Sequence, residues 1–166
     1  MGIAIIGSMS ASFRIRRADW NRDQAALRHV REIVFVHEQG VPLELEWDGI
    51  DPECQHVLAE DDRGTAIGTG RLLPNGHIGR MAVLQSWRNR GAGSALLCKL
   101  IAIAAERGMS EVALNAQTRA LKFYERHGFA AEGEVFLDAG IPHQRMRKSL
   151  GASDHGVASG AERSGS

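Results

Sequence analysis

One stretch constrains this chain more than any other. An apolar run that ends at Leu84 is followed by a loop of glycine and arginine, and then by a second apolar run from Ser94 to about Arg107. This order predicts a strand, a tight turn and a helix. Glycines let a backbone approach an anion closely, and the start of a helix offers unpaired N–H groups with a partial positive charge. We therefore expect a pyrophosphate cradle formed by Arg88, Asn89, Arg90, Gly91, Ala92, Gly93 and Ser94.

The loop lacks the features of two common phosphate-binding folds. It has no Gly-Lys-Ser/Thr ending, which argues against a P-loop nucleotide hydrolase. No Gly-x-Gly-x-x-Gly follows the first predicted strand, which argues against a dinucleotide-binding fold. The pattern that remains is Arg-x-x-Gly-x-Gly, from Arg88 to Gly93. Taken alone, it is also compatible with a glycine-rich turn that binds nothing.

A second segment makes the first more informative. A short predicted strand, Glu111–Asn115, is followed by a helical segment that carries Phe123 and Tyr124, and then by Gly128 and Phe129. Glycine at this position is typical of a helix end. In this order, with one helix and one strand between them, the two segments resemble the acetyl-CoA loop and the tyrosine helix of the GNAT superfamily of N-acetyltransferases.

Three further segments resemble the ElaA-like branch of that superfamily. They are residues 34–42, 48–59 and 140–146, and Ala116-Gln117 before the tyrosine helix adds to them. The resemblance extends from about Phe13 to Leu150. Many members have an asparagine that contacts CoA at the position of Gln117, and the side-chain amide of Gln117 can make similar contacts.

The resemblance implies both the fold and the reaction. In GNATs two strands separate beside the glycine loop, and the exposed backbone, here at Met81, Ala82 and Val83, pairs with pantetheine as a further strand would. An amine then attacks acetyl-CoA directly, and the hydroxyl of Tyr124 protonates the leaving thiolate. No cysteine or serine carries the signature of a nucleophile, which disfavours a covalent acyl-enzyme.

The general base is predicted from the segments that face the acceptor side in this family. An ammonium acceptor must lose a proton before it attacks, and a carboxylate or histidine can take it. Glu38 and His143 rank first because each lies in a branch-like segment. The other candidates are Glu44, Glu46, Asp48 and His56. For each, the alternative is a surface charge or a capping residue.

Composition limits the partners. Lys plus Arg and Asp plus Glu each number 20, so the charge balance gives no reason to expect nucleic acid or an anionic membrane as a partner. The two cysteines have no Cys-x-x-Cys spacing, which indicates reduced thiols and a cytoplasmic location. There is no His-Glu-x-x-His and no Cys/His cluster, so we expect no metal. A homodimer is compatible with the resemblance, since many GNATs dimerise.

The predicted architecture is an α/β (α+β) fold with a mixed central sheet of about seven strands and helices on both faces. The element order is β-α-(α)-βββ-α-β-α-β-β, with the first helix from Trp20 to Val36. We expect one domain from 13 to 150 between loose tails at 1–12 and 151–166, which are rich in glycine, serine and alanine.

Three functions remain open from the sequence. The first is an N-acetyltransferase that uses acetyl-CoA on a primary amine of a small molecule or a peptide. The second is a regulatory module that binds acyl-CoA without turnover. The third is a nucleotide-binding module that uses the glycine loop for another diphosphate.

Overall fold

The computed structural model describes residues 12–151 of the 166-residue chain. Of the predicted tails, only Ser12 and Gly151 fall within the described residues. The strands are β1 (Phe13–Ala18), β2 (Gln55–Asp61), β3 (Ala66–Leu72), β4 (Ile78–Val83), β5 (Glu111–Gln117), β6 (Ala130–Asp138) and β7 (Ile141–Ser149). The α-helices are α1 (Trp20–Arg31), α2 (Leu43–Glu46), α3 (Ala92–Glu106) and α4 (Leu121–Arg126), and a π-helix follows α1 at Glu32–Glu38. Short 3-10 turns lie at Asp51–Glu53, Gln85–Trp87 and Thr118–Ala120. The predicted element order is confirmed.

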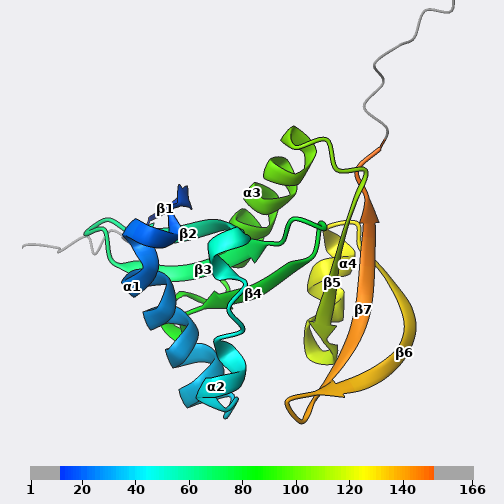
Figure 1. Ribbon diagram of the computed structural model, residues 1–166, viewed down its shortest axis with the longest axis horizontal. Helices are drawn as coiled ribbons and strands as arrows, with labels where there is room; N and C mark the ends of the chain where they lie inside the picture. The colour runs from blue at the N-terminus through cyan, green and yellow to red at the C-terminus, as the bar shows by residue number, and fades with distance from the viewer. Residues whose placement is uncertain (1–11, 152–166) are drawn as a thin grey trace, which may run out of the picture.

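The described strands form two antiparallel sheets that meet at one point (Figure 1). Their orders are β1-β2-β3-β4 and β5-β7-β6. A parallel bridge joins His77 to Ala113, and the Ala113 N–H donates to the Gly76 carbonyl at 3.1 Å. No other pairing joins β4 to β5 in the described chain, so the two strands separate beyond the bridge. The predicted mixed arrangement is confirmed, with its parallel part reduced to this bridge.

Helices α1 and α3 cover opposite faces of the first sheet, as predicted (Figure 1). Successive side chains of a strand point to opposite faces. On β2, Val57 therefore packs in one cluster with Leu96 of α3, whereas Leu58 packs in a second cluster with Leu27 of α1. The same alternation on β4 decides which face each cleft residue occupies.

A β-bulge interrupts β4 just beyond the junction of the two sheets. Thr69 pairs with Ala82 and Arg71 with Gly79, so one residue on β3 lies opposite two on β4, Arg80 and Met81. Arg80 has a φ of 49°, in the left-handed region that is unfavourable for a residue with a side chain. A bulge bends its strand and redirects side chains. Met81 consequently points to the α3 face, where its Cγ lies beside Gly70.

Two helix boundaries differ from the predictions. Helix α3 begins at Ala92, not at Ser94, because Gly91 adopts a φ of 87° as N-cap and the helical backbone starts at the next residue. The helix predicted from Trp20 to Val36 ends as an α-helix at Arg31 and continues as a π-helix to Glu38. Its wider hydrogen bonds include Gln39 N–H to the Val34 carbonyl at 3.1 Å. None of the helices between residues 12 and 151 is long and apolar enough to cross a membrane.

Candidate active site

A cleft of about 410 Å³ lies where β4 and β5 separate. One wall comes from the end of the π-helix, α2 and β4, and the other from β5, α4 and the β6–β7 hairpin. The polar and charged residues that line it are Gln39, Glu46, His77, Arg80, Asn115, Gln117, Tyr124, Asp138 and His143. The cleft thus gathers side chains from segments that are more than 100 residues apart in the sequence.

Tyr124 enters this cleft from α4. Its hydroxyl lies 3.9 Å from the Met81 sulfur, beside the bulge of β4. The ring meets Phe123 and Phe129 edge to face, with centroids 5.0 and 5.9 Å away. Burial raises the pKa of Tyr124 to about 12, so the hydroxyl keeps its proton at neutral pH. It can therefore act as a proton donor in the cleft.

The glycine loop presents the start of α3 beyond the end of β4. No side chain within the described range caps this helix, so its first N–H groups are open to an anion. Of the two arginines, Arg90 lies over the Trp87 ring at 5.1 Å. Ser94 is bound through its hydroxyl to Nε2 of His127 at 3.0 Å.

Arg88 is directed into the protein. Its Nε donates to the Val83 carbonyl at 2.9 Å, and its other two nitrogens contact Glu38 at 2.7 and 2.9 Å. Glu38 lies at the end of the π-helix and lines a second cavity of about 320 Å³, next to the main cleft. Arg88 and Glu38, which the sequence predicts as a CoA contact and a general base, therefore form an ion pair with each other.

Gln117 connects the two walls of the cleft. Its Nε2 donates to Gln39 Oε1 at 2.8 Å, and its own Oε1 accepts from Arg119 Nε at 3.0 Å. The side-chain amide is thus already engaged on both ends, at the boundary between the main cleft and the second cavity.

His143 lines the main cleft from β7. Its Nδ1 lies 2.6 Å from the Ile141 carbonyl, and its ring stacks on Phe136 at 6.0 Å. A ring nitrogen that faces a carbonyl must carry the proton, which leaves Nε2 as an acceptor in the neutral ring.

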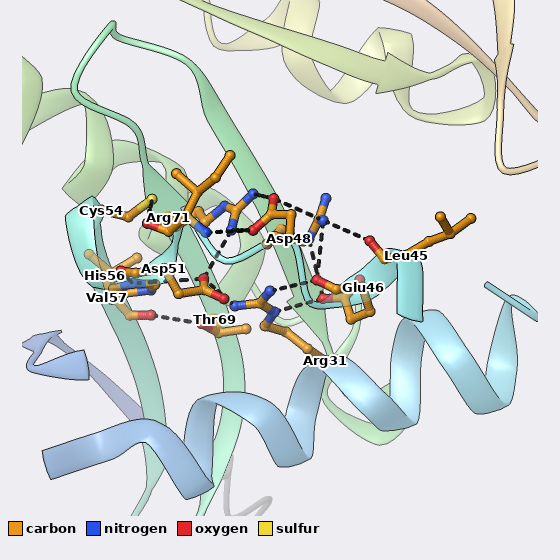
Figure 2. Close-up of polar contacts among 12 residues, drawn as sticks. Arg31, Leu45, Glu46, Asp48, Asp51, Cys54, His56, Val57, Thr69 and Arg71 are labelled. Atoms are coloured by element: carbon orange, nitrogen blue, oxygen red, sulfur yellow. Dashed lines mark hydrogen bonds and ion pairs between the residues drawn. The ribbon is translucent and has the colours of Figure 1, made fainter. Parts of the chain in front are cut away.

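Several of the other predicted acceptor-side groups belong to a buried charge network (Figure 2). Arg31 binds Glu46 and Asp51, each at 2.7 Å, and Arg71 binds Asp51 at 2.9 Å. These four side chains are at most 5% exposed. Burial would raise the pKa of Asp51, but hydrogen bonds from Arg31 and Arg71 outweigh it and lower that pKa. The network fixes the segment from α2 to β2 against α1.

Asp48 and His56 extend this network, whereas Glu44 lies exposed on α2. Arg71 also pairs with Asp48, and His56 Nε2 lies 2.8 Å from the Asp51 carbonyl. Burial lowers the pKa of His56, so its ring is neutral and donates this hydrogen bond. Sequence reasoning missed Arg31 and Arg71, because no local pattern marks a cation whose partners lie 15 to 23 residues away.

Sequence reasoning also missed His77 as a cleft residue. It follows the Asn75-Gly76 turn and stands at the bridge to Ala113. Residues 12–151 contain no group of three or more His, Cys, Asp or Glu side chains arranged to hold a metal ion.

Comparison with known proteins assigns the family. Residues 24–150 match the family model described as the acetyltransferase (GNAT) domain. The chain belongs to the GNAT family. A curated relative from Bacillus subtilis, "Uncharacterized N-acetyltransferase YjcF", is 43% identical over 124 residues, which cover 72% of this chain and 88% of the relative.

Solved GNAT structures agree with this assignment. Escherichia coli ElaA superposes with a TM-score of 0.74 at 26% identity, over 81% of this chain and 99% of ElaA. An acyl-CoA N-acyltransferase from Pseudomonas aeruginosa superposes with a TM-score of 0.73 at 31% identity, over 82% and 99% of the two chains. The predicted resemblance to ElaA is confirmed, and the chain is a GNAT acyltransferase.

Proposed function

We propose that this GNAT transfers the acetyl group of acetyl-CoA to a primary amine. The observation that carries the proposal is the order of three features along the chain around β4. They are the uncapped start of α3, the edge of β4 that β5 leaves unpaired, and the Tyr124 hydroxyl beside Met81. A CoA thioester has the same order of groups, with a pyrophosphate, an amide-bearing arm and a reactive sulfur.

The proposed CoA contacts follow this path. The edge of β4 at Met81, Ala82 and Val83 pairs with the pantetheine amides, as an added strand would. The loop binds the pyrophosphate through Asn89, Arg90, Gly91, Ala92, Gly93 and Ser94. Arg88 supports the edge of β4, because its Nε donates a hydrogen bond to the Val83 carbonyl. Gln117 contacts the arm from β5 once its bond to Gln39 opens.

The chemistry is a direct transfer. A neutral amine attacks the thioester carbonyl, the C–N bond forms, and the C–S bond then breaks. The N–H near Val83 stabilises the oxyanion that develops on the carbonyl. The nitrogen loses one proton to solvent as the amide forms, and Tyr124 donates its proton to the departing thiolate and regains one from solvent.

Of the two residues that the sequence ranks first as general base, His143 fits the cleft better than Glu38. Nε2 of His143 is left as an acceptor, whereas both carboxylate oxygens of Glu38 bind Arg88. Both residues stay predictions until their variants are assayed.

The test combines ligand-dependent melting with a thiol-release assay. CoA should raise the melting temperature more than ADP does, and acetyl-CoA should release thiol with at least one of polyamines, amino sugars, amino acids or lysine peptides. Stabilisation by CoA without release on any amine class would instead indicate the non-catalytic acyl-CoA module. Equal stabilisation by ADP would contradict the proposed CoA site.

A further inference from the structure

His77 is a cleft residue with no partner for its ring in the described chain. It lines the cleft beside the bridge to Ala113, where β4 and β5 begin to separate. The ring lies next to Gly79, since a Cβ at that glycine would be 3.9 Å from His77 Cδ2. Its backbone N–H binds Asn75, but neither ring nitrogen is hydrogen-bonded to any residue between 12 and 151. A half-buried imidazole that faces a cleft in this way is available to a ligand.

The side of β4 that His77 occupies follows from the alternation of the strand. Ile78 packs in the cluster with α3, so His77 and Gly79 point to the opposite face. Paired residues on neighbouring antiparallel strands project to the same side, and Gly79 pairs with Arg71. The Arg71 side chain reaches Asp48 and Asp51 on the α1 face (Figure 2). His77 therefore faces the side on which α1 and α2 lie.

Tyr124 approaches from the other side. It contacts Met81, whose side chain lies beside Gly70 and packs with the α3 cluster. The two cleft residues thus reach the same space from opposite faces of β4. A base and an acid that reach the cleft from different sides can serve the incoming amine and the departing thiolate separately.

The surroundings of His77 keep its ring neutral. Burial, followed by the positive charges of Arg145 on β7, Arg71 on β3 and Arg80 on β4, lowers its pKa below the ordinary 6.5. The other titratable groups of the cleft are Glu46 on α2, Asp138 and His143 on the β6–β7 hairpin, and Tyr124. Glu46 is already bound by Arg31 and lies 3.3 Å from Arg80. A neutral imidazole at neutral pH can accept a proton.

We propose that His77 is the catalytic residue that accepts a proton from the acceptor ammonium. The role rests on the proposed acetyl transfer. The ammonium gives one proton to a ring nitrogen of His77, which releases it to solvent, and the neutral amine attacks the thioester. The nitrogen loses a second proton to solvent as the amide forms, and Tyr124 protonates the thiolate and is reprotonated. The products are an amide, a free thiol and one net proton.

Two small acceptors separate this role from a structural one. Ethylamine is protonated at neutral pH and needs a base, whereas trifluoroethylamine is already largely neutral. With wild-type protein, acetyl-CoA and each amine at high concentration, we expect thiol release with both. His77→Gln should lower kcat/KM for ethylamine by about a hundredfold, and that for trifluoroethylamine by only a few-fold.

The same preparations supply the controls. His29→Gln, at an exposed position on α1, should match wild type. The affinity of His77→Gln for CoA should be unchanged. The rate of the wild type should fall as the pH drops through the lowered pKa of His77, and this fall should be absent from the variant. Equal losses on both amines, or a selective loss on ethylamine in His143→Gln but not in His77→Gln, would overturn the assignment and leave acetyl transfer standing. If the wild type acetylates neither amine, the same comparison is made with the panel amine that it does acetylate, at pH values below and above the pKa of that amine. Failure on these two amines and on every amine of the panel would overturn the proposed function itself, and this role with it.

Discussion

Arg88 and Glu38 form a two-contact ion pair, at 2.7 and 2.9 Å, that joins the glycine loop to the end of the π-helix. The same arginine holds the Val83 carbonyl at 2.9 Å. The pair therefore connects three parts of the site: the loop before α3, the edge of β4, and the segment that leads to α2. The ion pair also engages both oxygens of the Glu38 carboxylate, which the sequence predicts as a general base.

The first prediction concerns Glu38→Gln. The two side chains are 35% and 32% exposed, and ion pairs of this exposure contribute about 1 kcal/mol or less. We expect a rise of up to about fivefold in the Kd for CoA and a kcat within a few-fold of wild type. Steady-state kinetics and calorimetry would measure both. A loss of about a hundredfold in kcat at unchanged Kd would instead mark Glu38 as the base.

The second prediction concerns the hydroxyl of Tyr124. Tyr124→Phe keeps the ring contacts with Phe123 and Phe129 but removes the proton donor. We expect kcat to fall by about a hundredfold while the Kd for CoA is unchanged. Single-turnover assays would separate this chemical step from product release.

The pH profile of the wild type gives an independent check on Tyr124. Because burial raises its pKa to about 12, the hydroxyl stays protonated through the ordinary tyrosine value of 10.0. Loss of the acid should therefore begin only above that value. A fall in the wild-type rate that is centred on pH 10.0 and absent from Tyr124→Phe would contradict the burial of the Tyr124 hydroxyl.

The parts of the site that the sequence predicts are those with local signals. The strand–loop–helix around Gly91 occupies one continuous segment, so its glycine positions and apolar runs are sufficient to predict it, whereas the helix of Tyr124 is predicted from the resemblance to GNATs and from Gly128 at its end. The resemblance to GNATs then supplied their relation in space. The structure adds that Tyr124 contacts Met81, a residue 43 positions away.

The parts that could not be predicted depend on distant contacts. The bulge at Arg80 exists only in relation to β3, and the change from α-helix to π-helix after Arg31 has no glycine or proline to mark it. Asp51 is bound by arginines from α1 and β3, each 20 residues away. His77 becomes a cleft residue only because β5 leaves β4 beside it.

The third prediction compares two glycines of the loop. Gly91 has a φ of 87°, where alanine is strained although a Cβ would meet nothing within 4 Å. Gly93 is helical, and its Cβ would make an ordinary 3.6 Å contact with Phe123. Gly91→Ala should therefore lower the free energy of unfolding by about 1 kcal/mol. Gly93→Ala should raise it by up to about 1 kcal/mol, since alanine favours a helix.

Thermal and urea unfolding of the two loop variants would test this contrast. Similar destabilisation by both would mean that Gly93 is constrained by packing on Phe123. Stabilisation by Gly91→Ala would mean that the loop does not hold the left-handed conformation from which α3 starts.

The fourth prediction concerns the buried network. Arg31→Met removes the cation that binds both Glu46 and Asp51, which are 3% and 4% exposed in their side chains. Breaking a buried ion pair leaves an uncompensated charge and costs about 3–5 kcal/mol. We expect a loss of about 3 kcal/mol here, because Arg71 still binds Asp51 and Arg80 lies 3.3 Å from Glu46.

Arg17→Met is the matched control for Arg31→Met. It removes an equal charge from a pair with Glu106 in which the side chains are 49% and 61% exposed, so its cost should not exceed about 1 kcal/mol. Urea unfolding measures both variants. Equal, small losses would mean that water reaches Glu46 and Asp51 once the arginine is gone. A large loss confined to Arg31→Met, accompanied by a higher KM for the amine at unchanged CoA affinity, would show that this network holds α2 against the cleft.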